Sequence, residues 1–164
     1  MKKLLVLFLA AAMSLSLLAG CGNSDSGSSS KNVDPAKLAD DVLAALAPQG
    51  EMMEAGEKVL SNYYTVDSKV VKSSKIYISS SWTAEEVAVF RLVDGKQETM
   101  DAAEAMIQQR IDNLTASFDG YLPEELAILE DNSVIYRQGD IICFVSGSAD
   151  GVAAAMKVMK ETCE

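Results

Sequence analysis

The sequence predicts an α+β fold: a four-stranded, mostly antiparallel sheet with helices packed on one face. Three observations predict it. Residues 97–119 carry the longest helical periodicity of the chain, strand-like pairs lie before and after it at 75–93 and 133–146, and an amphipathic segment follows at 150–163. Strands that follow one another in sequence usually pair, and such a sheet buries a face under its helices. The expected order is strand-strand-helix-strand-strand-helix.

Before this domain, the chain begins as an export signal. Lys2 and Lys3 precede an uncharged run from Leu4 to Leu18 that is dominated by Leu, Ala, Val and Phe. The run is about 15 residues long, which fits a signal peptide and falls short of the roughly 20 residues that span a bilayer. Because positive charge stays on the cytoplasmic side, the rest of the chain is expected outside.

Four residues close the signal: Leu18, Ala19, Gly20 and Cys21. They resemble the lipobox of bacterial lipoproteins, in which small residues admit the signal peptidase and the cysteine becomes the acylated first residue. This predicts a lipoprotein signal peptide over residues 1–20 and palmitate-like chains on Cys21. An ordinary secretory signal or a membrane-spanning helix fits worse by length and by the cysteine. Two or more acyl chains, at ~0.8 kcal/mol per buried CH₂, would anchor the protein in the lipid bilayer on the extracytoplasmic face of the cell membrane.

The lipidated Cys21 is expected to open a tether over residues 21–33. From Gly22 to Val33 the sequence reads GNSDSGSSSKNV and is nearly free of apolar residues. Such a segment cannot offset its ordering entropy by burial, so it predicts a flexible linker with a reach of roughly 20 Å. Residues 34–164 then form a single domain, long enough to bury a core without metals or disulfides.

The charge of the chain bounds its partners. The formal charge is −10, and loss of residues 1–20 removes two lysines and no acid, which leaves −12. Binding to nucleic acid needs clustered Lys and Arg, so no nucleic-acid partner is expected. Anionic lipid head groups would not attract this domain either, so the acyl anchor must hold it at the membrane.

Two helices are expected at the start of the domain. Asp34 suits an N-cap and Pro35 suits the first helical position, and the apolar residues that follow recur at helical spacing until Pro48. A second apolar periodicity, from Met52 to Tyr63, predicts another helix. Residues 64–74 show no clear period.

The strands are expected in two pairs. Residues 75–80 are β-branched and aromatic, and residues 86–93 are almost continuously apolar, which indicates a central strand buried on much of both faces. Residues 133–137 and 140–146 form the second pair, joined by a tight turn in which Gly139 supplies a positive φ.

The helix expected over residues 97–119 has one apolar stripe, with residues three and four apart, that predicts its buried side. The stripe consists of Met100, Ala103, Ile107, Ile111, Leu114 and Phe118. Gly120 ends this helix, and Pro123 begins a short helix that runs through Leu129. The last helix, at 150–163, also has a buried side.

The sequence offers no catalytic constellation. It contains no histidine, which removes the commonest general base and the commonest zinc ligand, and it has no glycine-rich phosphate loop. The carboxylates of Glu85 and Glu86, and those of Glu124 and Glu125, are adjacent in sequence, so each pair points in different directions and forms no glycosidase dyad. We therefore expect no enzyme, no cofactor and no metal.

Four other side chains are open to a functional or a structural interpretation. Cys143 and Cys163 could form a disulfide, but rough geometry separates their Cα atoms beyond the ~7 Å limit, so two buried free thiols are expected. Arg110 lies near the apolar stripe of the long helix and is expected to form an ion pair, with Glu124 or Glu125 as candidate partners, or to donate to a helix-end carbonyl, rather than to contact a ligand. Trp82 is expected to cap the core, with an exposed anchor for a partner as the alternative.

Part of the chain resembles a known family. The lipobox, the stretch Thr83–Phe90 (TAEEVAVF), Arg110 on the long helix and Tyr121–Glu124 (YLPE) resemble a group of short Gram-positive bacterial lipoproteins catalogued as a domain of unknown function, DUF4358. The resemblance covers most of residues 34–164. It implies a cell-surface lipoprotein with an α+β domain, and it assigns no activity and no functional residues.

These observations predict a membrane-anchored lipoprotein whose domain binds a protein, a peptide or a small ligand without catalysing a reaction. One alternative is an accessory or assembly subunit of a membrane complex, because tethering raises effective concentration. Another is an enzyme that uses carboxylates or serine. A deep pocket with two converging carboxylates would favour the enzyme, and a flat apolar patch around Trp82 would favour an interaction domain.

Overall fold

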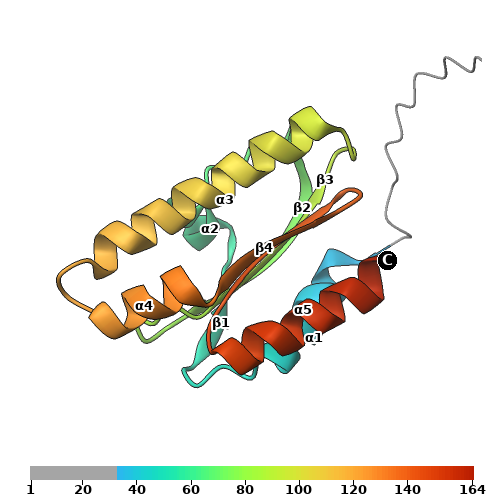
Figure 1. Cartoon of the computed structure of the whole chain (residues 1–164). Coiled ribbons are helices and arrows are strands. Elements are labelled where there is room, and N and C mark those ends of the chain that lie inside the picture. Colours follow the sequence, from blue (N-terminus) through green and yellow to red (C-terminus); the bar gives the residue numbers. More distant parts are fainter. Residues whose placement is uncertain (1–32) are drawn as a thin grey trace, which may run out of the picture.

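A five-stranded antiparallel sheet organises the computed structural model, which describes residues 33–164 (Figure 1). The strand order is β1-β2-β3-β5-β4, and all neighbouring strands are antiparallel. The strands are β1 (Met52–Glu54), β2 (Val71–Ser79), β3 (Glu86–Leu92), β4 (Ser133–Gln138) and β5 (Ile141–Ser146). The helices are α1 (Pro35–Leu46), α2 (Glu57–Tyr63), α3 (Gln97–Phe118), α4 (Pro123–Asp131) and α5 (Ala149–Cys163). The α+β class is confirmed, and the sheet has one strand more than predicted.

The centre of the sheet is formed by β3 and β5. All residues of β5 are buried, and so are all residues of β3 except Arg91. Alternate side chains of β3 enter different cores: Ala88 and Phe90 lie in one, and Val87 and Val89 lie in the other. The almost continuous apolar sequence of this strand therefore reflects burial on both faces, as predicted.

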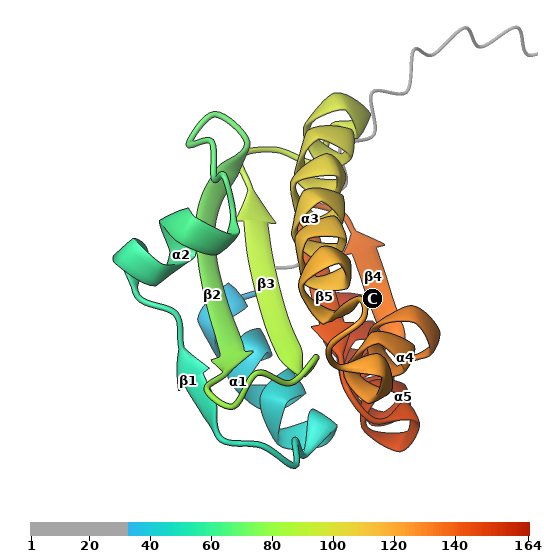
Figure 2. The same cartoon turned by 90° about the vertical axis from the view of Figure 1, so that its left-hand side faces the viewer.

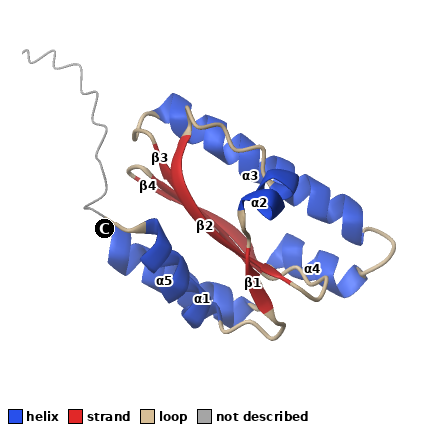
Figure 3. Cartoon of the chain, turned by 180° about the vertical axis from the view of Figure 1, so that it is seen from behind, coloured by secondary structure: helices blue, strands red, loops and turns tan. Residues whose placement is uncertain are grey.

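Helices cover both faces of the sheet, so the prediction that they pack on one face is wrong (Figures 2 and 3). The face with α3 and α4 also carries α2, and α1 and α5 cover the opposite face. The physical reason is that central strands with two apolar faces need a layer on each side. Gly151 permits the close contact of α5 with α1, because a Cβ at this position would lie 2.3 Å from the carbonyl oxygen of Leu46.

The segment from Met52 to Tyr63 is a strand followed by a short helix, not the single helix predicted. Met52–Glu54 pairs with the end of β2, and the pairing continues as Ala55 N donates to the Ile76 carbonyl at 2.9 Å. Gly56 is the N-cap of α2 and has extended backbone. Pairing with the sheet edge thus replaces helical hydrogen bonds over the first residues, and it creates the fifth strand.

Several local signals are confirmed. Asp34 caps α1, since its Oδ1 accepts a hydrogen bond from Ala36 N at 2.9 Å. Gly139 has a φ of 60° in the turn between β4 and β5. The start of β2, at Val71, is earlier than predicted, because its pairing with β3 extends to Leu92.

The predicted signal peptide, the acylation of Cys21 and residues 21–32 of the tether lie outside the described residues. Val33 belongs to the domain rather than to the tether: it is buried, and its carbonyl accepts a hydrogen bond from Arg91 Nη1 at 3.0 Å. Within residues 33–164, no helix is long and apolar enough to cross a membrane.

Candidate ligand-binding site

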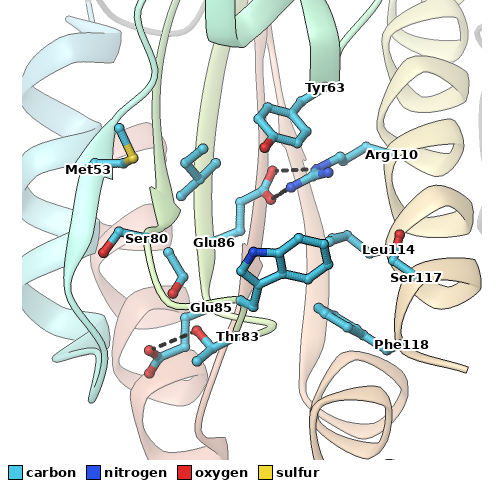
Figure 4. Close-up of a pocket in the computed structure, with 13 residues that line it drawn as sticks. Met53, Tyr63, Ser80, Thr83, Glu85, Glu86, Arg110, Leu114, Ser117 and Phe118 are labelled. Atoms are coloured by element: carbon cyan, nitrogen blue, oxygen red, sulfur yellow. Dashed lines mark hydrogen bonds and ion pairs between the residues drawn. The ribbon is translucent and has the colours of Figure 1, made fainter. Parts of the chain in front are cut away.

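A cavity of about 320 Å³, here called the Trp82 cavity, opens on the sheet face that carries α2 and α3 (Figure 4). Strands β1 and β2 and the helix α3 border it, together with the end of α2 and the loop between β2 and β3. Its wall combines aromatic and aliphatic side chains with hydroxyl and charged groups. The lining residues are Met53, Tyr63, Ile78, Ser79, Ser80, Trp82, Thr83, Glu85, Glu86, Arg110, Leu114, Ser117 and Phe118.

A buried ion pair between Glu86 on β3 and Arg110 on α3 lines this cavity (Figure 4). Arg110 Nη2 lies 2.6 Å from Glu86 Oε2, and Arg110 Nε lies 3.1 Å from the same oxygen. The hydroxyl of Tyr64 donates a hydrogen bond to Glu86 Oε1. The side chain of Arg110 is only 9% exposed and that of Glu86 only 2%. Each therefore depends on the other for compensation of its charge.

The prediction that Arg110 pairs with Glu124 or Glu125 is wrong. Arg110 occupies a buried position on the α3 stripe and so faces β3, where Glu86 lies. Glu125 instead accepts a hydrogen bond from Ala84 N at 2.7 Å. The helical periodicity placed Arg110 correctly near the buried side, but the partner strand could be identified only from the packing of α3 on the sheet.

The Arg110 guanidinium also stacks on an aromatic ring. Its central carbon lies 4.3 Å from the ring centroid of Tyr63, which makes a cation–π contact. Burial lowers the pKa of Arg110, but the adjacent Glu86 carboxylate outweighs burial and raises it. Burial and the same carboxylate raise the pKa of Tyr64 well above its usual value. Arg110 therefore stays charged, and Tyr64 stays a neutral hydrogen-bond donor.

We expect the protein to lose stability at alkaline pH, in part through Tyr64. Since the pKa of Tyr64 is raised in the folded state from an ordinary value of 10.0, its stabilisation is complete below that value and is lost as the pH rises above it. Urea unfolding should therefore show a lower midpoint at about pH 11 than at about pH 8. Tyr64→Phe should show a smaller difference between the two pH values. The remainder comes from other groups whose pKa burial raises: Tyr136, to about 12, Tyr77, Cys143 and Cys163. An undiminished difference in Tyr64→Phe would contradict this assignment.

Trp82 lies in the loop between β2 and β3 and is 74% exposed, so the expectation that it caps the core is wrong. Its φ is 58°, in the left-handed region that residues other than glycine rarely adopt. Hydrogen bonds on both sides hold the loop: Ser80 N donates to the Glu51 carbonyl at 2.9 Å, and Ala84 N donates to Glu125 at 2.7 Å. The indole is thus held at the cavity by a fixed backbone.

The two carboxylates that line the cavity are already occupied. Glu85 accepts hydrogen bonds from Gln49 N at 2.7 Å and from Gly50 N at 2.9 Å. Both oxygens of Glu86 are taken by Tyr64 and Arg110. Both carboxylates are thus committed to hydrogen bonds within the protein.

Three donors at the cavity remain available to a ligand. Among residues 33–164, with the side chains of Glu57 and Val59 left aside, the hydrogen bonds of Arg110 use Nε and Nη2 and leave Nη1 without a partner. The indole N–H of Trp82 and the hydroxyl of Tyr63 also lack hydrogen-bond partners among these residues, and the two residues are 74% and 39% exposed. The cavity therefore presents donors beside aromatic surface, which suits a ligand with apolar groups and hydrogen-bond acceptors.

Residues 45–147 match the family described as Domain of unknown function (DUF4358). The chain belongs to the DUF4358 family. The matched span contains every residue that lines the Trp82 cavity. No curated protein and no solved structure matches the chain.

Exposed apolar side chains of this DUF4358 domain gather around the cavity. Among the residues whose side chains the structure describes, five large hydrophobic residues are exposed, and Met53, Tyr63 and Trp82 line the cavity. Tyr121 is 84% exposed, and its N–H donates to the carbonyl of Phe118, whose side chain is also part of the lining. Val93 is the fifth. Such concentration of exposed apolar surface marks interaction sites.

The two cysteines of the DUF4358 domain lie on the other side of the sheet. Both are buried free thiols in the core between the sheet and the α1–α5 layer, as the spacing argument predicts. Burial raises the pKa of Cys143 far above its ordinary value and that of Cys163 to about 11. Such thiols are poor nucleophiles at neutral pH. Within residues 33–164, no group of three or more cysteine or acidic side chains could hold a metal ion.

Proposed function

We propose that the protein is a lipoprotein, anchored by acylated Cys21 on the extracytoplasmic face of the cell membrane, whose domain binds a ligand without catalysis. The ligand is held in the Trp82 cavity. The observation that carries this proposal is the pairing of unused donors on Arg110, Trp82 and Tyr63 with exposed aromatic surface. A site of this kind recognises a ligand by stacking and hydrogen bonding.

Two features of the cavity favour binding over catalysis. Glu85 and Glu86 are each engaged by the protein itself, so they position structure rather than await a substrate proton. Arg110 is fixed by Glu86 on one side and by the Tyr63 ring on the other. A preformed, rigid set of donors limits the ordering entropy lost on association.

The anchor and the tether support the location of this site outside the membrane. The lipobox ends at Cys21, and the polar linker that follows allows the domain to reach ligands near the lipid surface. The formal charge of −12 after removal of residues 1–20 disfavours attraction to anionic head groups, which would keep the domain clear of the bilayer.

Fluorescence of Trp82 tests the proposal directly, because this is the only tryptophan of the chain. The full-length protein in detergent would be titrated with peptides, amino acids and soluble sugars. At least one class should change the emission in a saturable manner. In Trp82→Ala, affinity measured by calorimetry should fall about 30-fold, since central aromatic residues of binding sites contribute 2 kcal/mol or more. Val93→Ala, at an exposed hydrophobic residue that does not line the cavity, serves as the control and should retain affinity within about threefold.

A saturable ligand that binds Trp82→Ala as tightly as the unaltered protein would contradict the assignment of the cavity. Release of a chemically altered product during the titration would contradict the non-enzymatic part of the proposal.

A further inference from the structure

We propose that the ligand is an extended peptide segment of a partner protein, which adds as a strand to the outer edge of β1 and places an apolar side chain in the Trp82 cavity. This inference rests on the proposed function and names its ligand class. It follows from three observations: an unpaired sheet edge, the position of that edge beside the cavity, and the hydrogen-bonding character of the cavity.

The outer edge of β1 has free backbone groups. β1 is the terminal strand of the sheet. Ser80 N donates to the Glu51 carbonyl and Ala55 N donates to the Ile76 carbonyl, both at 2.9 Å. Because hydrogen-bonding direction alternates along an antiparallel strand, Met53 also faces β2, whereas the N–H and C=O groups of Met52 and Glu54 point away from the sheet. An extended peptide would find its partners there.

The cavity begins at this same edge. Met53 lies on β1 and lines the cavity, and its strand partner Ile78 does so from β2. Figure 4 shows Met53 at one side of the cavity, opposite Arg110 and Phe118 on α3. Side chains directly across a strand pair point to the same face, so the residue that an added strand places beside Met53 would project toward Trp82.

The chemistry of the cavity matches a peptide. Trp, Tyr and Arg are the residues most enriched at the energetic centres of protein interfaces, and Trp82, Tyr63 and Arg110 meet here. Their unused groups are donors, and a peptide presents a carbonyl acceptor at every residue. The exposed carboxylates of Glu51 and Glu54 at the same edge favour a neutral or basic segment.

The two sheet edges provide a matched pair of proline variants. Proline at Glu54 removes an outward-facing N–H and leaves the ladder to β2 intact. Arg137 occupies the equivalent outward position on β4, at the opposite edge. Both residues are exposed, and each contributes one surface ion pair, Glu54 to Lys75 and Arg137 to Glu104. Glu54→Pro should therefore block strand addition, and Arg137→Pro should not.

The test uses a positional-scanning library of N-acetylated, C-amidated hexapeptides against the full-length protein in detergent. Selected peptides should carry an aromatic or aliphatic residue at one position and should change Trp82 fluorescence. Their affinity should fall about tenfold or more in Glu54→Pro and stay within about twofold in Arg137→Pro. N-methylation of alternate peptide amides should reproduce the loss. Urea midpoints should confirm that both variants are folded.

The possible negative results distinguish failure of strand addition, of the peptide inference and of the proposed binding function. Selected peptides that bind Glu54→Pro and Arg137→Pro equally would overturn strand addition. If no hexapeptide binds and Trp82 fluorescence responds to a soluble sugar such as N-acetylglucosamine, the peptide inference falls and the proposed binding function stands. If neither peptides, amino acids nor sugars bind, the proposed function falls with it.

Discussion

Arg110→Met will lower the free energy of unfolding by about 3–5 kcal/mol, because it leaves Glu86 as an uncompensated buried charge. The substitution removes the ion pair and the cation–π contact with Tyr63 while it retains much of the side-chain volume. Urea denaturation at about pH 7 measures the effect. This is the largest stability effect that we expect from a single substitution at the Trp82 cavity.

The exposed pair between Arg137 and Glu104, with side chains 46% and 39% exposed, supplies the matched control. Arg137→Met should cost about 0–1 kcal/mol, because water already solvates both charges. The triple variant Arg110→Met, Glu86→Leu and Tyr64→Phe should recover most of the loss, because apolar replacement of the whole buried pair is often neutral and Tyr64→Phe removes the hydroxyl that would otherwise lose its acceptor. A loss below about 1 kcal/mol in Arg110→Met would mean that Glu86 is not dependent on Arg110.

Cys21→Ala will move the protein from the membrane fraction to the soluble fraction, because it removes the thiol that we propose carries the acyl chains. The fold should not change, since the residue precedes the domain. Fractionation of cells followed by immunoblotting measures the distribution, and circular dichroism compares the fold.

Cys163→Ala is the appropriate comparison, because it also removes a cysteine but from the buried core of the domain. This variant should stay in the membrane fraction. If Cys21→Ala sediments with membranes as completely as the unaltered protein, acylation at Cys21 is not what anchors it.

Periodicity predicted the elements with strong local patterns. The buried stripe of α3, the β4–β5 turn at Gly139 and the cap at Asp34 all follow from short-range chemistry, and the structure confirms them. The structure of residues 52–63 was harder to predict, because an apolar pattern in a short segment fits either a helix or a strand. Pairing with the available edge of β2 decides for a strand at Met52–Glu54.

The second helical layer could have been inferred from the sequence of β3. A strand whose residues from Val87 to Phe90 are all apolar needs cover on two faces, and residues 35–46 and 149–163 supply helices for the second face. The prediction of helices on one face was therefore inconsistent with the correct prediction that β3 is buried on both faces.

The candidate site could not be predicted from the sequence, for a different reason. Glu86 and Arg110 lie on separate elements, and helical periodicity alone does not show which strand packs against α3. Trp82 belongs to no periodic pattern in the sequence. Its exposure depends on the hydrogen bonds that tie its loop to Glu51 and Glu125. Only the three-dimensional contacts bring Trp82, Tyr63 and Arg110 together.

The most direct test of the account is a map of where a selected hexapeptide binds, from a nitrogen–proton correlation spectrum of the full-length protein. We predict that the single indole N–H signal, from Trp82, the Arg110 Nε–H signal and the amides of β1 shift together on addition of the peptide. Shifts confined to the opposite face, around Tyr136 and α5, with an unmoved indole signal would contradict it.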